Sequence, residues 1–216
     1  MRLTLRYPPA RGACDGIRVA LAVAGVGVRE DTGTTSRALP GATGGTRFAG
    51  PVHPELLVED GDDAPFLVSH AAPVLLWLQA AVLAPSVVLS PRHVAALTGW
   101  LSEAARLEAA VVHADWYLCA PELGPRSLAC AKAAFAERHV ASSLAAWEAG
   151  AAASATRSPA CTASPRGAVH LVGSVLTVAD LQVYSTLCFV DRTFGDLLSI
   201  ASFATLHQLW AAFDAM

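Results

Sequence analysis

The sequence predicts a two-domain protein, in which a small mixed α/β domain precedes an all-helical domain. Residues 1–80 read as strand, helix, strand, irregular segment, hairpin and helix, which is the plan of a mixed four-stranded sheet with helices packed on it. Residues 92–216 contain no convincing strand and consist mainly of alanine-rich helical stretches. Prolines mark residues 81–91 as the linker between the two domains.

The composition limits the classes of protein to which the chain can belong. Of the 216 residues, 54% are hydrophobic and 15% are charged, a balance that excludes a disordered chain. A net charge of −3 without a basic patch argues against direct binding of nucleic acid. The five cysteines are scattered without a CxxC pair, so we expect reduced thiols in a cytoplasmic protein. Residues 71–89 carry no charge, but Pro73 and Pro85 interrupt them, which favours a buried helix and a linker over a membrane span.

Local patterns predict the first three elements. Alternating apolar and polar side chains predict a strand over residues 3–7. The prolines and the glycine of residues 8–12 then force a loop. Apolar residues at positions i, i+3, i+4 and i+7 predict a helix that begins near Asp15 and ends at Gly25. Two valines with polar neighbours predict a second strand at residues 26–28.

The remainder of the first domain reads as a connection, a hairpin and a helix. Residues 31–51 are rich in Gly, Thr and Ser and predict an irregular connection. Residues 55–59 and 65–68 flank the turn residues 60–63, which is a β-hairpin pattern. Ser69 is suited to cap the helix that follows, because its hydroxyl can accept a hydrogen bond from a first-turn N–H. That role alone requires no ligand.

Helical periodicity fills most of the second domain. It predicts one helix over residues 94–116, which Pro121 and Gly124 end, and another over residues 126–148. Residues 151–168 are of low complexity, rich in Ala, Ser, Thr and Pro, and we expect them to form a disordered loop.

The most specific local signal lies at residues 171–187. Thr177 is a helix N-cap, and Asp180, three residues later, reaches back to it in a capping box. Leu176 and Leu181 stand where they complete a hydrophobic staple. The helix that follows is apolar nearly all round, as a buried central helix is, and loss of its cap is expected to cost about 1 kcal/mol.

The stretch LRYPPARGACDGIRVALAVAGV, residues 5–26, resembles the opening of cytosolic glutathione transferases of the tyrosine type. The matching residues are Tyr7, Arg11, Gly12, Ile17 and Arg18. Residues 52–54 are similar to the cis-proline segment of that family, and Ser69 is similar to the serine that holds the γ-glutamyl carboxylate of glutathione. The resemblance implies a thioredoxin-like domain over residues 1–80 and a helical domain of the same family over residues 92–216.

The resemblance also implies a chemistry. Tyr7 would donate its phenolic hydrogen to the glutathione sulfur and favour the thiolate, which attacks an apolar electrophile. The backbone around His53 and Pro54 would pair with the cysteinyl part of glutathione, and Ser69 would hold its carboxylate. Glutathione is then a co-substrate, with no further cofactor, and the seven spread-out histidines predict no metal site. Val68 departs from the family, which usually has Gln or Glu before the serine. Without the resemblance, Tyr7 is more simply a packing residue.

The motif LVGSVLTVADLQVYSTL, residues 171–187, closely resembles the "VG-x-x-[LV]-T-x-AD" segment of the sixth helix in the same family. The resemblance implies that Thr177 and Asp180 are structural. The helical half is also similar to those of elongation factor one gamma and of multi-synthetase complex proteins. An alternative function is therefore a non-catalytic interaction module in a translation-factor or aminoacyl-tRNA-synthetase complex. On either function we expect a homodimer, or a heterodimer with another domain of this kind, and no membrane partner.

Overall fold

The computed structural model of the chain describes residues 1–7, 14–32, 53–61, 64–85, 89–118, 125–157 and 169–214. The chain divides into two compact units, Met1–Val88 and Leu89–Met216. Of the residues that carry the family resemblance, Arg11, Gly12 and Val52 lie outside the described ranges.

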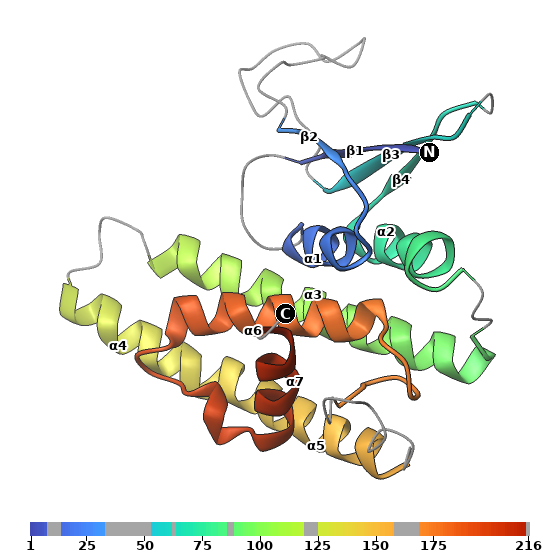
Figure 1. The fold of residues 1–216 in the computed structure, drawn as a ribbon. Coiled ribbons are helices and arrows are strands. Elements are labelled where there is room, and N and C mark those ends of the chain that lie inside the picture. Colours follow the sequence, from blue (N-terminus) through green and yellow to red (C-terminus); the bar gives the residue numbers. More distant parts are fainter. Residues whose placement is uncertain are drawn as a thin grey trace, which may run out of the picture. The chain divides into compact units, whose positions relative to one another are not determined.

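The first unit contains a mixed four-stranded sheet in the order β2-β1-β3-β4. The strands are β1 (Arg2–Arg6), β2 (Arg29–Asp31), β3 (Glu55–Glu59) and β4 (Phe66–Ser69). β1 runs parallel to β2 and antiparallel to β3, and β3 pairs antiparallel with β4. Helices α1 (Asp15–Val23) and α2 (Ala71–Leu78) lie on one face of this sheet (Figure 1), and a π-helical turn, η1 (Gln79–Leu83), extends α2. This topology confirms the predicted mixed sheet.

The core of the first unit lies between the sheet and these two helices. Leu3 and Leu5 of β1 are each 1% exposed, as their alternation with polar residues predicts. Further buried side chains come from β3 and from the inner faces of the helices: Leu56, Val58, Ile17, Leu21, Val74, Leu75 and Leu78. The edge strand β2 is short and charged, which discourages pairing with another chain.

The predicted position of the second strand is wrong by three residues. The strand lies at Arg29–Asp31, because residues 24–26 form the C-terminal cap of α1. Gly25 has a φ of +66°, the Gly25 N–H donates to the Ala22 carbonyl at 3.0 Å, and the Val26 N–H donates to the Leu21 carbonyl at 3.0 Å. These two bonds make a Schellman motif. Because the motif engages the Val26 N–H, the strand begins only further along the chain.

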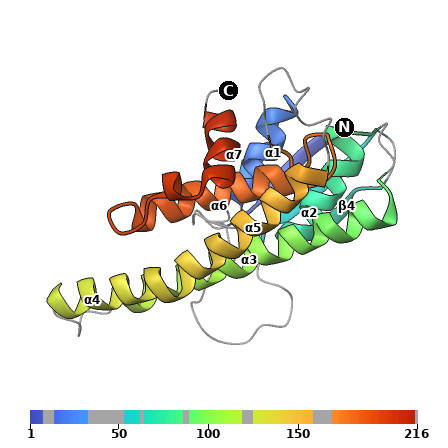
Figure 2. The ribbon, with the colours of Figure 1, turned by 90° about the horizontal axis from the view of Figure 1, so that it is seen from below.

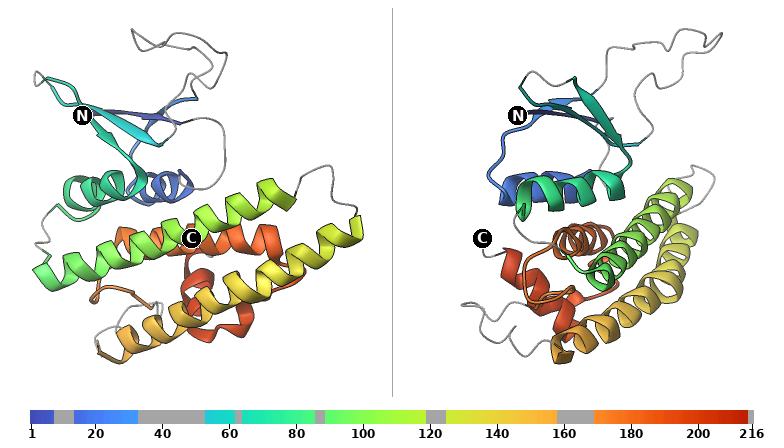
Figure 3. Two further views of the ribbon diagram at one scale, coloured as in Figure 1. Left: turned by 180° about the vertical axis from the view of Figure 1, so that it is seen from behind. Right: turned by 90° about the vertical axis from the view of Figure 1, so that its right-hand side faces the viewer.

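In the described residues of the second unit, all the regular secondary structure is helical. α3 (Pro91–Leu118) is followed by α4 (Pro125–Phe135), a π-helical segment η2 (Ala136–Ala141) and α5 (Ser142–Arg157). Figures 2 and 3 show that the last three run as one long rod beside α3. α6 (Val178–Phe194) packs against α3, and α7 (Ala204–Asp214), preceded by the short 3-10 helix η4 (Ile200–Ser202), packs against α5 and α6. In the described part of the chain, none of the helices has the length and hydropathy needed to span a bilayer.

The predicted loop over residues 151–168 is wrong in its first part, because α5 continues to Arg157. Ala151 is 1% exposed, and the Ser154 hydroxyl donates to the Leu171 carbonyl at 2.8 Å. Alanine is the best helix former, and tertiary contacts on one side are enough to keep this low-complexity segment helical. Residues 158–168 lie outside the described ranges.

Two buried polar groups organise α6. The Asp180 carboxylate accepts hydrogen bonds from the Thr177 N–H at 2.7 Å, from the Thr177 hydroxyl at 2.9 Å and from the Leu171 N–H at 2.7 Å, so α6 begins with a capping box. Burial raises the pKa of Asp180, and these three bonds oppose the rise. The Glu108 carboxylate of α3 accepts from Gln182 and Thr186 at 2.8 Å each, which links α3 to α6.

Candidate functional site

The site predicted from the sequence lies at one end of the sheet. The register pairs Arg6 with Glu55 and Glu55 with Ser69, so β1 and β4 end, and β3 begins, at the same level. The residues just beyond these ends are Tyr7 on β1, Pro54 on β3 and His70 after β4. The His70 N–H donates to the Pro54 carbonyl at 2.8 Å, which extends the β3–β4 ladder by one bond. Pairing of the strands therefore brings the predicted site residues to one sheet end.

Tyr7 follows the last residue of β1 and is half-buried. Its N–H donates to the Asp31 carbonyl of β2 at 3.3 Å, which ties the backbone at Tyr7 to the parallel neighbour. Because this bond holds the backbone, the position from which the Tyr7 side chain extends is fixed. A phenol hydroxyl can both donate and accept a hydrogen bond, and donation to a sulfur is the role expected of Tyr7.

The segment before β3 differs from the family-like prediction. The described residues contain no cis peptide bond, so the bond between His53 and Pro54 is trans and the predicted cis-proline is wrong. Pro54 is buried, and its carbonyl is engaged by His70 within the sheet. His53 is exposed. His53 thus lies next to this hydrogen bond, at the same end of the sheet.

The predicted helix cap at Ser69 is also wrong. Ser69 is the last residue of β4 and pairs with Glu55, and the N-cap of α2 is His70. The ladder explains the shift, since Ser69 stays in the strand while the chain turns at His70. His70 has φ 74° and ψ 146°, and it is the one non-glycine residue with positive φ in the described part of the chain. Glycine favours this region, so His70 is held in a strained conformation.

The N-terminus of α2 faces the same end of the sheet. Ala71 and Ala72 occupy the first turn, where N–H groups have no acceptor within the helix. Pro73 follows, and because it also lies in the first turn, its missing N–H removes no helical hydrogen bond. The helix dipole adds a partial positive charge at this end. The backbone of Ala71 and Ala72 is therefore suited to a carboxylate.

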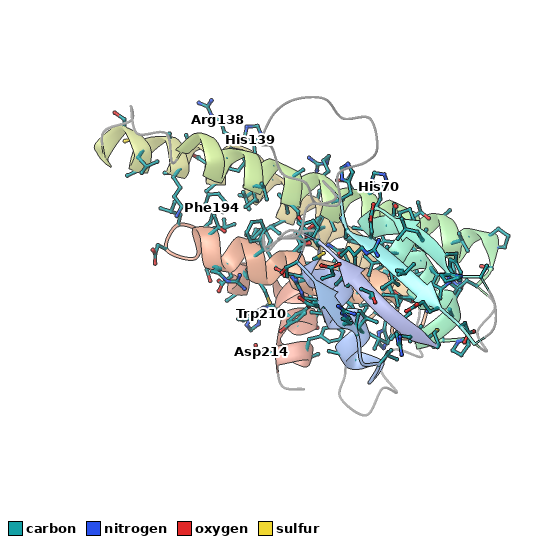
Figure 4. All side chains as sticks on the ribbon, turned by 90° about the horizontal axis from the view of Figure 1, so that it is seen from above. His70, Arg138, His139, Phe194, Trp210 and Asp214 are labelled. Carbon is teal, nitrogen blue, oxygen red and sulfur yellow. The ribbon has the colours of Figure 1, made fainter. Side chains whose placement is uncertain are left out.

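Two histidine rings meet beside this helix start. The ring centroids of His53 and His70 lie 4.2 Å apart, with 37° between the ring planes. Both residues are exposed, and Figure 4 shows His70 at the end of the sheet. The sequence predicts His53 as a site residue through its backbone but does not single out His70. The proximity of His70 to His53 follows only from the strand register, because the two residues are far apart in the chain.

Arg18, one of the residues that match the family opening, has a structural role. Its guanidinium donates to Glu30 of β2 at 2.7 and 3.0 Å and to Asp15 at 3.2 Å, so it fastens α1 to the edge strand. Hydrogen bonding to Glu30 raises the pKa of Arg18, and the same bond lowers the pKa of Glu30. Cys14, immediately before α1, is fully buried, so its thiol belongs to the core of the first unit.

No family model and no curated protein matches the sequence. Solved structures do match. A sigma class glutathione transferase of Fasciola hepatica has a TM-score of 0.69 at 18% identity, covering 99% of this chain and 90% of that one. Ure2p in complex with glutathione has a TM-score of 0.68 at 16% identity, covering 100% and 90%. A Caenorhabditis elegans glutathione transferase has a TM-score of 0.64 at 17% identity, covering 99% and 92%.

The chain has the glutathione transferase fold. The likeness spans both units, since each comparison covers nearly all of this chain. It confirms the thioredoxin-like first half and the helical second half that the sequence predicts. At identities of 16–18% the likeness concerns the fold, and the chemistry has to be argued from the residues at the sheet end.

Proposed function

We propose that the protein binds glutathione at the sheet end formed by Tyr7, His53 and the start of α2, and that it transfers the glutathione thiolate to apolar electrophiles. One observation carries the proposal: the strand register brings the tyrosine, the segment before β3 and the helix N-terminus together. The presence of glutathione in the Ure2p structure, which has the same fold, supports it.

Tyr7 is the residue proposed to act on the sulfur. A hydrogen bond from its phenol stabilises the thiolate more than the thiol and thus lowers the thiol pKa. A fall of about two units from about 8.5 requires roughly 2.7 kcal/mol. A charge-assisted hydrogen bond supplies about 1.5–3 kcal/mol, so one donor accounts for most of the change. The resulting thiolate is the nucleophile that attacks the electrophile.

The carboxylate of the γ-glutamyl group is proposed to bind at the start of α2. The N–H groups of Ala71 and Ala72 point along the helix axis toward an anion at this position. Ser69, which precedes the turn at His70, contributes its half-buried side chain from the end of β4. The backbone of His53, just before β3, then pairs with the cysteinyl part of glutathione through main-chain hydrogen bonds.

A calorimetric titration with reduced glutathione tests the binding step. We expect micromolar to millimolar affinity for the wild-type protein, and conjugation of an aryl halide electrophile in a coupled absorbance assay. Tyr7→Phe should retain binding of S-methylglutathione, which has no thiol proton, but lose at least roughly tenfold in conjugation rate, because about 1.4 kcal/mol corresponds to tenfold. Tyr184→Phe, in α6, is the matched control and should conjugate at the wild-type rate.

Absence of heat at millimolar glutathione would contradict this function. The alternative, an interaction module of a translation-factor or aminoacyl-tRNA-synthetase complex, would then be favoured. Val68 supports it, because an apolar side chain stands where the family has a polar one. Its test is co-purification of the folded wild-type protein with such complexes. The expected homodimer or heterodimer is tested separately, by light scattering of the purified protein.

A further inference from the structure

His53 and His70 form an exposed pair whose position is set by the sheet. His53 immediately precedes Pro54, and the Pro54 carbonyl accepts the hydrogen bond of the His70 N–H at 2.8 Å. This backbone hydrogen bond therefore fixes the distance between the α-carbons of His53 and His70. The ring centroids are 4.2 Å apart. Both rings start from ordered backbone and both are accessible from solvent.

We propose that the His53–His70 pair is a binding site for a divalent first-row transition metal ion, with Cu²⁺ bound most tightly. Neutral imidazole is a preferred ligand of Cu²⁺, Ni²⁺ and Zn²⁺. With metal–nitrogen bonds of about 2.1 Å, two imidazoles in adjacent coordination positions have ring centroids roughly 4.5 Å apart. The observed 4.2 Å is close to this value.

The site has two protein ligands and open positions. In the described part of the chain no group of three or more His, Cys, Asp or Glu side chains converges on a metal ion. Water or a small ligand would complete the coordination sphere, as in exchangeable metal sites. With two imidazoles and no thiolate, the affinity should follow the order Cu²⁺ > Ni²⁺ > Co²⁺ that such ligands show.

The inference does not depend on glutathione binding, because the metal alone is the probe. Purified full-length protein is titrated with CuCl₂ and NiCl₂ in the absence of glutathione, against a chromophoric chelator. We expect one Cu²⁺ per chain bound with micromolar affinity. Loss of a residue that only hydrogen-bonds to a metal ligand typically weakens metal binding about 10-fold or more. Loss of a ligand itself, in His53→Gln or His70→Gln, should therefore weaken Cu²⁺ binding at least roughly tenfold. His93→Gln, which removes an exposed histidine from α3, is the matched control and should bind as the wild type does.

A second measurement separates loss of ligand from loss of fold. In the wild-type protein, substoichiometric Cu²⁺ should broaden the imidazole resonances of His53 and His70 before those of other histidines. The circular dichroism spectra of the variants should equal that of the wild type, which shows that the variants are folded. Equal broadening of all histidines, or unchanged affinity in the folded double variant His53→Gln/His70→Gln, would overturn the proposal.

Discussion

His70 unites an exposed imidazole with a backbone conformation that suits glycine. Its φ of 74° is imposed from both sides, because its N–H belongs to the β3–β4 ladder and its carbonyl accepts from the Val74 N–H in the first turn of α2. Conformations of this kind cost about 1–3 kcal/mol and persist where surrounding structure determines them. Strained backbone conformations occur often at ligand sites, which agrees with the place of His70 beside the proposed glutathione and metal positions.

The first residue-scale prediction follows from that conformation. His70→Gly removes the strain but adds the entropy that glycine loses on folding, about 0.5–1 kcal/mol. The net effect should be a stabilisation of the first unit by about 1 kcal/mol. Hydrogen exchange of the buried β1 and β3 amides measures it as slower exchange. His53→Gly is the control, since His53 has no positive φ, and it should not slow exchange. Faster exchange in His70→Gly would show that the turn is not strained.

At the scale of elements, the start of α7 is held by a side chain from α5. The Glu148 carboxylate accepts from the Thr205 N–H at 2.8 Å, from the Thr205 hydroxyl at 2.6 Å and from the Leu206 N–H at 3.0 Å. Partial burial raises the pKa of Glu148, but the hydrogen bonds from Thr205 and Leu206 outweigh it, so the pKa lies below its usual range. Glu148 thus acts as an N-cap supplied by another helix.

The cap gives a prediction with a defined dependence on pH. Glu148→Ala should lower the free energy of unfolding by about 1–2 kcal/mol at pH 7. Because the folded pKa is depressed, the ionised carboxylate contributes fully above the unfolded pKa of about 4.3, and its contribution is lost as the pH falls through the lower folded value. Urea unfolding followed by circular dichroism should show the difference from wild type shrinking below about pH 4.

The control for this prediction is Glu137→Ala, which removes an exposed carboxylate from η2 and should change the stability by less than about 0.5 kcal/mol. A difference between wild type and Glu148→Ala that stays constant down to pH 3 would mean that packing of the side chain, and not its charge, secures α7.

Elements also show which features can be predicted from sequence. The capping box at Thr177 and Asp180 is a local pattern and could be read directly. The end of α5 could not, because the contact of Ser154 with the Leu171 carbonyl is tertiary. The start of α2 depends on whether Ser69 pairs with Glu55, which no local pattern reveals. Glu148 carries no sequence signal at all, since its partners lie on a distant helix.

At the scale of the whole molecule, three hydrogen-bonded features of the second unit each join residues of that unit. The Asp180 cap, the Glu108 network and the Glu148 cap all join residues of Leu89–Met216. The proposed glutathione and metal positions all lie in Met1–Val88. Residue composition predicts two domains, because strand signals stop where the alanine-rich helices begin. It does not predict that Tyr7, His53 and His70 meet, since that depends on the sheet register.

This division predicts that residues 89–216 fold as a separate fragment. Their helices have their own buried core, including Leu97, Leu101, Val183 and Leu187, and a fragment of this size can bury enough surface to be stable. We expect helical circular dichroism and cooperative thermal unfolding of the fragment. Asp180→Ala leaves the N–H groups of Thr177 and Leu171 without their acceptor, and should destabilise it by about 2–4 kcal/mol. In the full chain the same substitution should leave Cu²⁺ affinity unchanged under conditions in which the protein remains folded. A fragment without a cooperative transition would show that the helical unit depends on the first unit for its stability.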